Sequence, residues 1–336
     1  MDRIRVLAGG ASLAVIGAVA LARLRRRRMP VGHRESAEAA VDAATRASPA
    51  ANGSTAAEIA SAVYLLGPWG RTQTNAYLVQ DGASWMLVDA GWAGDGSRIR
   101  AAVRSVLGPE LVPSAILLTH AHPDHCGSAR ELARAWGCPV FAHPDELPLA
   151  TGDFAAMVRF AGPLDRWLIL PAMRAIGRRR RGALLAGSSL AGVVHPLGSG
   201  GAIPGVAGWE WMPAPGHTPG QVAYVRARDR VVLSGDAVLT IEVNTWAGVL
   251  CQRQGISGPP WYTTWNRPAA MASIVAIADF EPTVLAGGHG LPLAGPGTAA
   301  AVHAFADRAM HTSRRRGSDR RSEAGARRGR GRGDAR

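Results

Sequence analysis

A ten-residue stretch in the first half of the chain, LTHAHPDHCG at 118–127, constrains the fold more than any other feature. It places three histidines and a carboxylate within six positions, directly after the apolar run Ala115–Leu118. A strand that ends in a rigid loop turns imidazole and carboxylate side chains toward a common point. The stretch therefore predicts a strand followed by a metal-binding loop, whose remaining ligands come from elsewhere in the chain.

Length and composition allow this loop to sit in an ordinary globular domain. The chain has 336 residues, of which 47% are hydrophobic and 19% charged, so hydrophobic burial can stabilise it without cross-links. Its three cysteines, Cys126, Cys138 and Cys251, are too few and too odd in number for a disulfide framework. The set fits a reducing compartment.

The net charge of +13 is concentrated at the two ends of the chain. Residues 1–34 hold eight arginines against one aspartate, and residues 314–336 hold ten arginines against three acids, so each end carries +7. Residues 35–313 are therefore close to neutral, at about −1. A neutral core predicts no specific nucleic-acid partner.

Residues 1–28 are predicted to be a membrane anchor with a basic flank. Val6–Ala22 is uncharged and apolar, and more arginines follow it than precede it. The positive-inside rule then places the main domain in the cytoplasm, anchored to the inner face of the membrane by residues 6–22. A cleaved signal peptide, which the arginines at 25–28 disfavour, and an extension without a membrane role are the alternatives.

The rest of the chain divides into a linker at 29–55, a folded domain at 56–312 and an Arg-rich tail at 313–336 that is expected to be disordered. A helical segment is expected as an insert at about 145–205, covering a site or touching a membrane surface. Strands and helices otherwise alternate, which is typical of layered α/β architecture. Strands are predicted at 63–66, 75–79, 85–88, 115–118, 139–142, 209–212, 222–225, 231–234 and 283–286, and helices at 96–107, 128–136, 274–280 and 299–309.

Three later motifs each place one ligand-type residue on a glycine-flanked turn after a predicted strand. They are PGHTPG with His217, SGD with Asp236 and GGHG with His289. Asp89 follows the strand at 85–88 in a similar turn. Histidines scattered at random would not share this context, so these residues are predicted to complete the site begun by His120.

With these motifs in this order, the chain resembles the metallo-β-lactamase superfamily, in the hydrolase branch with an H-x-H-x-D-H signature, close to its glyoxalase II-like and lactonase-like group. The resemblance covers Val63 to Ala309. It implies a four-layer αβ/βα sandwich, formed by a single catalytic domain. It also implies a two-metal site at the edge where the loops of the two sheets meet.

The resemblance implies two divalent metal ions, with Zn²⁺ expected ahead of Fe or Mn. A metal-bound hydroxide would be the nucleophile, and Asp124 would act as the catalytic residue that orients it. Asp89 would support the metal loop through hydrogen bonds without being a ligand. The resemblance implies that the first metal is bound by His120, His122 and His217. The second would be bound by Asp124, His125 and His289, and Asp236 would bridge both.

An aromatic cluster between Asp236 and His289 is a candidate substrate wall. Trp261 and Tyr262 belong to it, and Tyr262 could donate a hydrogen bond to a developing oxyanion. Core packing beneath the loop is the competing interpretation.

The function predicted from these observations is binuclear metal-dependent hydrolysis of a small ester, thioester or lactone, so the expected partner is a small molecule. A nuclease or phosphodiesterase of the same fold, a mononuclear iron oxygenase and a membrane-associated binding protein are the alternatives. No basic glutathione-binding module of the glyoxalase II kind is recognisable.

Overall fold

The computed structural model describes the backbone of residues 45–46 and all of residues 56–82, 84–109 and 111–312. The predicted anchor at 6–22, the predicted tail at 313–336 and nearly all of the predicted linker lie outside the described residues. Among the helices that are described, none is both long enough and apolar enough to cross a membrane.

A seven-stranded sheet forms the half of the domain nearer the N-terminus in sequence. Its strands lie in chain order, antiparallel from β2 to β5 and parallel from β5 to β8. The change falls at β5, which pairs antiparallel with β4 and parallel with β6, the strand that leads into the histidine motif. The strands are β2 (Ala56–Ala60), β3 (Val63–Trp69), β4 (Thr74–Asp81), β5 (Ser84–Val88), β6 (Ala115–Leu117), β7 (Val140–Ala142) and β8 (Val194–Pro196).

A six-stranded sheet in the order β1-β15-β14-β11-β10-β9 forms the other half. A separate two-stranded ribbon pairs β12 with β13. The strands are β1 (Thr45–Arg46), β9 (Glu210–Pro213), β10 (Val222–Arg226), β11 (Val231–Gly235), β12 (Leu239–Ile241), β13 (Gln254–Ser257), β14 (Val284–Gly287) and β15 (Leu293–Ala294).

Each sheet is covered on both faces, which explains why its strands read as continuous apolar runs. On β5, Trp85 and Leu87 pack in the cluster beneath the outer helices, whereas Met86 and Val88 pack in the cluster between the sheets. The outer helices are α3 (Gly96–Leu107) and α5 (Ala129–Trp136) on the first sheet, and α11 (Arg267–Asp279) and a helix over 298–312 on the second.

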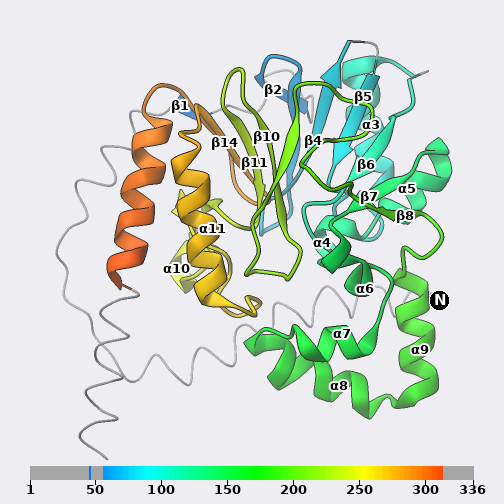
Figure 1. Ribbon diagram of the computed structural model, residues 1–336. Coiled ribbons are helices and arrows are strands. Elements are labelled where there is room, and N and C mark those ends of the chain that lie inside the picture. The colour runs from blue at the N-terminus through cyan, green and yellow to red at the C-terminus, as the bar shows by residue number, and fades with distance from the viewer. Residues whose placement is uncertain (1–44, 47–55, 83, 110, 313–336) are drawn as a thin grey trace, which may run out of the picture. The chain divides into compact units, whose positions relative to one another are not determined.

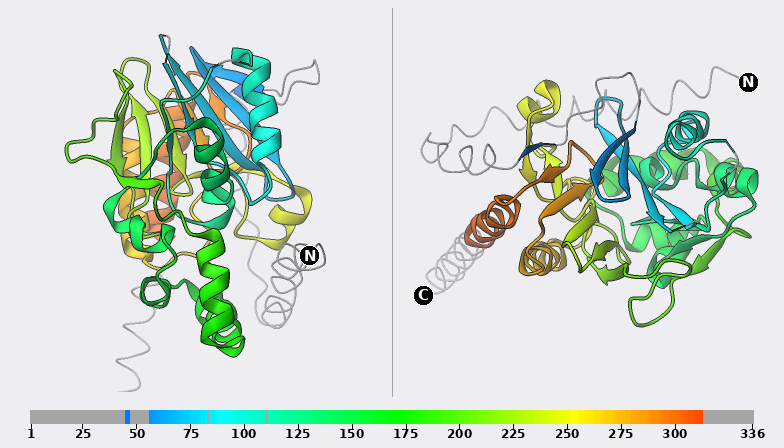
Figure 2. Two further views of the ribbon diagram at one scale, coloured as in Figure 1. Left: turned by 90° about the vertical axis from the view of Figure 1, so that its right-hand side faces the viewer. Right: turned by 90° about the horizontal axis from the view of Figure 1, so that it is seen from above.

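The result is two sheets packed face to face with helices outside both (Figures 1 and 2). This is the four-layer αβ/βα sandwich that the sequence predicts. A chain of shorter helices leaves the sandwich between β7 and β8: η2 (Pro144–Glu146), α6 (Leu147–Ala150), α7 (Phe154–Arg159), η3 (Asp165–Ile169), α8 (Leu170–Ala175) and α9 (Gly177–Ser188).

Several elements differ from the sequence predictions. The predicted insert extends too far, because its residues Val194–Pro196 pair with β7 as a strand of the first sheet. Helix α11 begins seven residues earlier than the predicted start at 274, at Arg267, where Asn266 caps it by accepting a hydrogen bond from the Ala269 N–H. The short ribbon β12–β13 and helix α10 (Trp246–Cys251) were not predicted, because segments this short carry little periodicity.

The core between the sheets should dominate stability. Leu117 is fully buried in it, so Leu117→Ala is expected to lower the free energy of unfolding by about 2–5 kcal/mol. Leu111→Ala is the matched control, because Leu111 is 44% exposed and should change stability by less than about 0.5 kcal/mol. Urea unfolding of both variants measures the difference, and equal effects would contradict this assignment of the core.

Candidate metal centre

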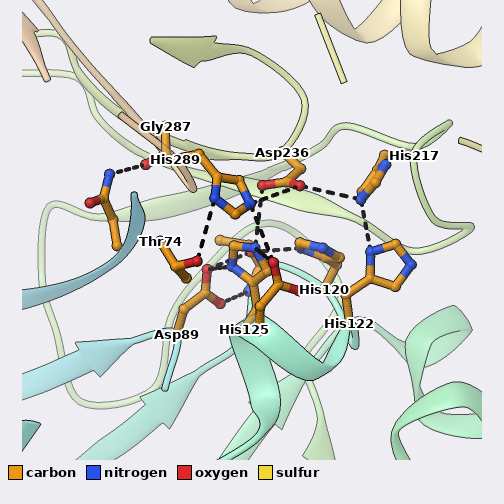
Figure 3. Close-up of polar contacts among 12 residues, drawn as sticks. Thr74, Asp89, His120, His122, His125, His217, Asp236, Gly287 and His289 are labelled. Atoms are coloured by element: carbon orange, nitrogen blue, oxygen red, sulfur yellow. Dashed lines mark hydrogen bonds and ion pairs between the residues drawn. The ribbon is translucent and has the colours of Figure 1, made fainter. Parts of the chain in front are cut away.

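Seven imidazole and carboxylate side chains meet at one edge of the sandwich, each delivered by the end of a strand (Figure 3). The loop after β6 and the short helix α4 (Pro123–Cys126) supply four of them from the first sheet. The turns before β10, after β11 and after β14 supply the others from the second sheet. The seven are His120, His122, Asp124, His125, His217, Asp236 and His289.

The first group of donors is His120, His122 and His217, whose ligand atoms lie within 4.8 Å of one another. His217 Nε2 is 2.8 Å from His122 Nδ1. His122 therefore faces the centre with Nδ1. Three imidazole nitrogens converging in this way could hold one divalent metal ion.

The second group is Asp124, His125 and His289, again within 4.8 Å of one another. The Asp124 Oδ2 atom lies 3.7 Å from His125 Nε2 and 3.4 Å from His289 Nε2. One carboxylate with two imidazoles is a donor set that suits several first-row metals.

Asp236 lies between the two groups. Its Oδ2 is 3.4 Å from His217 Nε2 and 3.5 Å from His289 Nε2, and its Oδ1 is 3.3 Å from His125 Nε2. The carboxylate thus reaches donors of both groups at once. A single carboxylate in this position could bridge two cations.

Hydrogen bonds on the far side of four rings turn Nε2 toward the centre. His125 Nδ1 lies 2.8 Å from Asp89 Oδ2, and His289 Nδ1 lies 2.9 Å from the Thr72 carbonyl oxygen. His217 Nδ1 is 3.3 Å from the hydroxyl of Thr264. His120 Nδ1 is likewise 3.1 Å from the Thr119 hydroxyl. Such partners leave the Nε2 lone pair free for a metal ion.

Three buried atoms that face the centre have no hydrogen-bond partner among the described residues: His120 Nε2, His125 Nε2 and Asp236 Oδ1. Leaving a buried polar atom unpaired costs free energy. A cation at the centre would satisfy all three. The donor set and these unpaired atoms therefore fit divalent metal ions.

The electrostatics of the two groups differ. Burial lowers the pKa of His217 to about 3 and the pKa of His120 well below its usual value, so both rings are neutral, as metal ligands must be. Burial also opposes the charged form of His289, but Asp236 and Asp124 raise its pKa to about 9. His289 and His125 hold the pKa of the Asp236 carboxyl well below its usual range, against the effect of burial.

Asp89 supports the loop at 119–125 through hydrogen bonds and is not one of the seven residues whose side chains meet at the centre. Its Oδ1 accepts a hydrogen bond of 2.8 Å from the Thr119 N–H, and its Oδ2 accepts one of 2.8 Å from the Thr119 hydroxyl. Asp89 is buried and adopts a φ of +60°, a region that is unfavourable for a residue with a side chain. The contacts with Thr119 and His125 compensate for that strain.

Glu146 performs a similar task and was missed by the sequence analysis. Its side chain is fully buried, and its two oxygens each accept a 2.8 Å hydrogen bond, one from the Ala121 N–H and one from the Gly220 N–H. Glu146 thereby ties the loop of His120 and His122 to the loop of His217. Its local sequence, His-Pro-Asp-Glu, resembles a polar surface turn and carries no signal of this burial.

Gly288 was also missed, and its role is steric. A Cβ atom at this position would meet Asp236 Oδ1 and lie 2.6 Å from His125 Cε1. The strand-end turn that carries His289 can therefore approach the other donors closely because residue 288 is glycine.

The two aromatic residues predicted to form a substrate wall lie in the turn that precedes α11. Trp261 is 39% exposed, and its ring lies 5.8 Å from that of Tyr262 in an edge-on arrangement. Burial, together with the charges of Asp236 and Asp124, raises the pKa of Tyr262 to about 12. The hydroxyl of Tyr262 therefore stays protonated near these carboxylates. Binding of substrate to either residue remains a prediction.

The four-layer sandwich with a candidate metal centre at one edge is typical of metal-dependent hydrolases, and sequence comparison identifies the family. Residues 69–289 match the family model described as the metallo-beta-lactamase superfamily. The chain is also 33% identical over 226 residues to the probable metallo-hydrolase YflN of Bacillus subtilis, across 66% of this chain and 82% of that protein. The chain belongs to the metallo-β-lactamase superfamily.

Solved structures agree on the fold. BJP-1, a subclass B3 metallo-β-lactamase of Bradyrhizobium japonicum, is similar with a TM-score of 0.52 and 17% identity, over 80% of this chain and 96% of that one. The metallo-beta-lactamase family protein TTHA1429 of Thermus thermophilus is similar with a TM-score of 0.51 and 22% identity, over 76% and 81% of the two chains. At these identities the likeness shows the fold alone.

Replacing Asp89 should weaken metal binding without removing a donor. In Asp89→Asn, one carboxylate oxygen becomes an NH₂ group that cannot accept from His125 or Thr119, so the His125 ring loses its orientation. We expect metal affinity to fall roughly 10–100-fold, measured by competition with a chelator. Asp145→Asn is the control, since the Asp145 side chain is 68% exposed. Unchanged affinity in Asp89→Asn would show that Asp89 does not support the centre.

Proposed function

We propose that this protein is a binuclear metal-dependent hydrolase acting on a small ester, thioester or lactone. Membership of the superfamily supports hydrolase activity in general, and the convergent histidines and aspartates support divalent metal ions. The observation that carries the binuclear proposal is the position of Asp236, whose carboxylate reaches both groups of donors. A site for one metal would not need a carboxylate shared in this way.

In this proposal His120, His122 and His217 hold one metal ion, and Asp124, His125 and His289 hold the other. Divalent cations, when bound, lower the pKa of a water molecule and polarise a substrate carbonyl oxygen. Zinc is our preferred metal because neutral imidazoles and carboxylates suit it, although the same donors also accept iron or manganese.

Asp124 is proposed to position the attacking water. Its side chain is 17% exposed, compared with 4% for Asp236, so it is the more open of the two carboxylates. Burial opposes the charged form of Asp124, but His125 and His289 lower its pKa, so the Asp124 carboxylate is ionised at neutral pH. An ionised, partly open carboxylate can accept a hydrogen bond from water and so orient it for attack.

Metal content combined with a substrate panel tests the proposal. The wild-type chain should contain two metal ions and hydrolyse at least one of an ester, a thioester and a lactone. Asp236→Ala should lose at least one metal ion and slow hydrolysis by roughly a hundredfold or more. Asp145→Ala, at an exposed position, should match the wild type.

Each alternative predicts a different outcome of the same panel. One iron per chain with oxygen-dependent turnover would replace the proposal with an oxygenase. Cleavage of phosphodiesters alone would replace it with a phosphodiesterase. Full activity in Asp236→Ala would show that the bridging position is not used.

Tyr262 is proposed to stabilise negative charge on the substrate oxygen. Because its hydroxyl is protonated, Tyr262→Phe should remove one hydrogen-bond donor and lower kcat by roughly 10²–10³-fold, with metal content unchanged. Trp261→Phe keeps the aromatic surface and should change kcat little. If Tyr262→Phe alters KM alone, Tyr262 is a substrate wall and not an oxyanion donor.

A further inference from the structure

Residues 154–188, which we term the basic arm, project from the sandwich as α7, η3, α8 and α9 (Figures 1 and 2). The arm supplies none of the seven metal donors. Its surface composition is unusual in two independent respects, apolar exposure and charge.

The first respect is exposed apolar surface. Nine large hydrophobic side chains are exposed among the described residues, and four of them fall within the arm. Trp167 is the most exposed of the nine, at 85%, and Leu184 is 57% exposed. Ile176 and Val158 are the other two. A water-exposed tryptophan of this extent is costly unless a partner covers it.

The second respect is charge. The arm contains seven arginines and a single acid, Asp165, which gives it a net charge of +6. Since residues 35–313 together carry about −1, the remainder of that region carries about −7. Asp165 does not offset the exposed arginines, because it is half-buried and accepts a hydrogen bond from the Gly162 N–H. Arg178, Arg179 and Arg180 are all exposed.

The arm is a folded unit whose outward face is distinct from its packed face. Leu170 and Met173 are buried, whereas Trp167, Pro171 and Arg174 are exposed. Arg181 differs from the three arginines before it, because its guanidinium stacks 4.1 Å from the Phe154 ring and donates to the Met173 carbonyl oxygen. The arm therefore presents its tryptophan and arginines on a defined scaffold.

We propose that the basic arm docks on the surface of an anionic lipid bilayer. Tryptophan settles at the boundary between headgroups and acyl chains, and arginines bind acidic headgroups. Exposed aliphatic side chains such as Ile176 and Leu184 gain by entering that boundary, whereas a nucleic acid would offer them only phosphates and flat bases. A second copy of the arm would be repelled by its equal charge.

The arm also contacts the loop that carries the proposed substrate wall. The Leu164 N–H donates a 2.7 Å hydrogen bond to the Tyr262 carbonyl oxygen, and the Phe160 ring lies 5.1 Å from the Trp265 ring. If the arm docks on a bilayer, the loop that carries Tyr262 therefore lies close to the membrane surface. The proposal concerns attachment and does not depend on the metal chemistry.

Fluorescence quenching by brominated lipid tests the arm separately from every other part of the chain. The full-length chain is mixed with vesicles of brominated phosphatidylglycerol, which quenches only tryptophans that enter the bilayer. Quenching is expected in the wild type and should be largely lost in Trp167→Phe. Trp92→Phe is the matched control, because Trp92 is 42% exposed and lies outside the arm. Equal quenching in the wild type and Trp167→Phe would overturn the proposal.

A charge series tests the arginines. The triple change of Arg178, Arg179 and Arg180 to Ser should lower binding to phosphatidylglycerol vesicles roughly a hundredfold, in vesicle sedimentation at low salt. The control removes the same charge elsewhere, with Arg104, Arg134 and Arg308 each changed to Ser, all at exposed positions. Equal losses in both triple variants would overturn the proposal by showing that net charge, not the arm, controls binding.

Two further outcomes also decide against an anionic bilayer as the partner. Equal binding to uncharged phosphatidylcholine vesicles would contradict the role of the arginines. Arm-dependent binding of RNA without binding of vesicles would assign the arm to a phosphate polymer. Urea unfolding of each variant checks that the fold is intact, independently of the proposed activity.

Discussion

The shared carboxylate of Asp236 is the contact on which the rest of the centre depends. It lies 3.3–3.5 Å from imidazole nitrogens of His125, His217 and His289. Asp236 comes from the end of β11 in the second sheet, whereas His125 follows β6 in the first. The centre therefore exists only when the two sheets are packed against each other. Burial of the inner core is thus a condition for the chemistry as well as for stability.

Packing so many polar groups at one buried edge is costly unless each has a partner. The structure meets this cost with a supporting layer of hydrogen bonds around the donors. Asp89 fixes the His125 ring and the Thr119 backbone, and Glu146 joins the loops on either side of the first donor group. Among the candidate ligand atoms, His120 Nε2, His125 Nε2 and Asp236 Oδ1 are left without a hydrogen-bond partner, and a metal ion would supply the missing interaction there.

Charge and chemistry occupy different parts of the molecule. The donors lie at the edge of a sandwich that carries about −7, while the positive charge of the folded region is concentrated in the basic arm, at +6. With this separation, the proposed docking of the arm would leave the electrostatics of the donors unchanged. The separation also explains why the total net charge is a poor guide to what the site binds.

The sequence by itself indicated the helix at 96–107 through local periodicity. The family resemblance carried by its short motifs indicated the fold class and the seven candidate metal ligands that the structure brings together. Neither indicated the burial of Glu146, the β12–β13 ribbon or the sheet strand β8. Glu146 lies in a polar His-Pro-Asp-Glu segment, and strands of three or four residues are too short to show a period. The resemblance implied a bridging place for Asp236, but only the tertiary structure puts its carboxylate 3.3–3.5 Å from histidines of both groups and leaves Trp167 exposed. Distances between residues far apart in the chain are set by how the two sheets pack, and no local pattern encodes them.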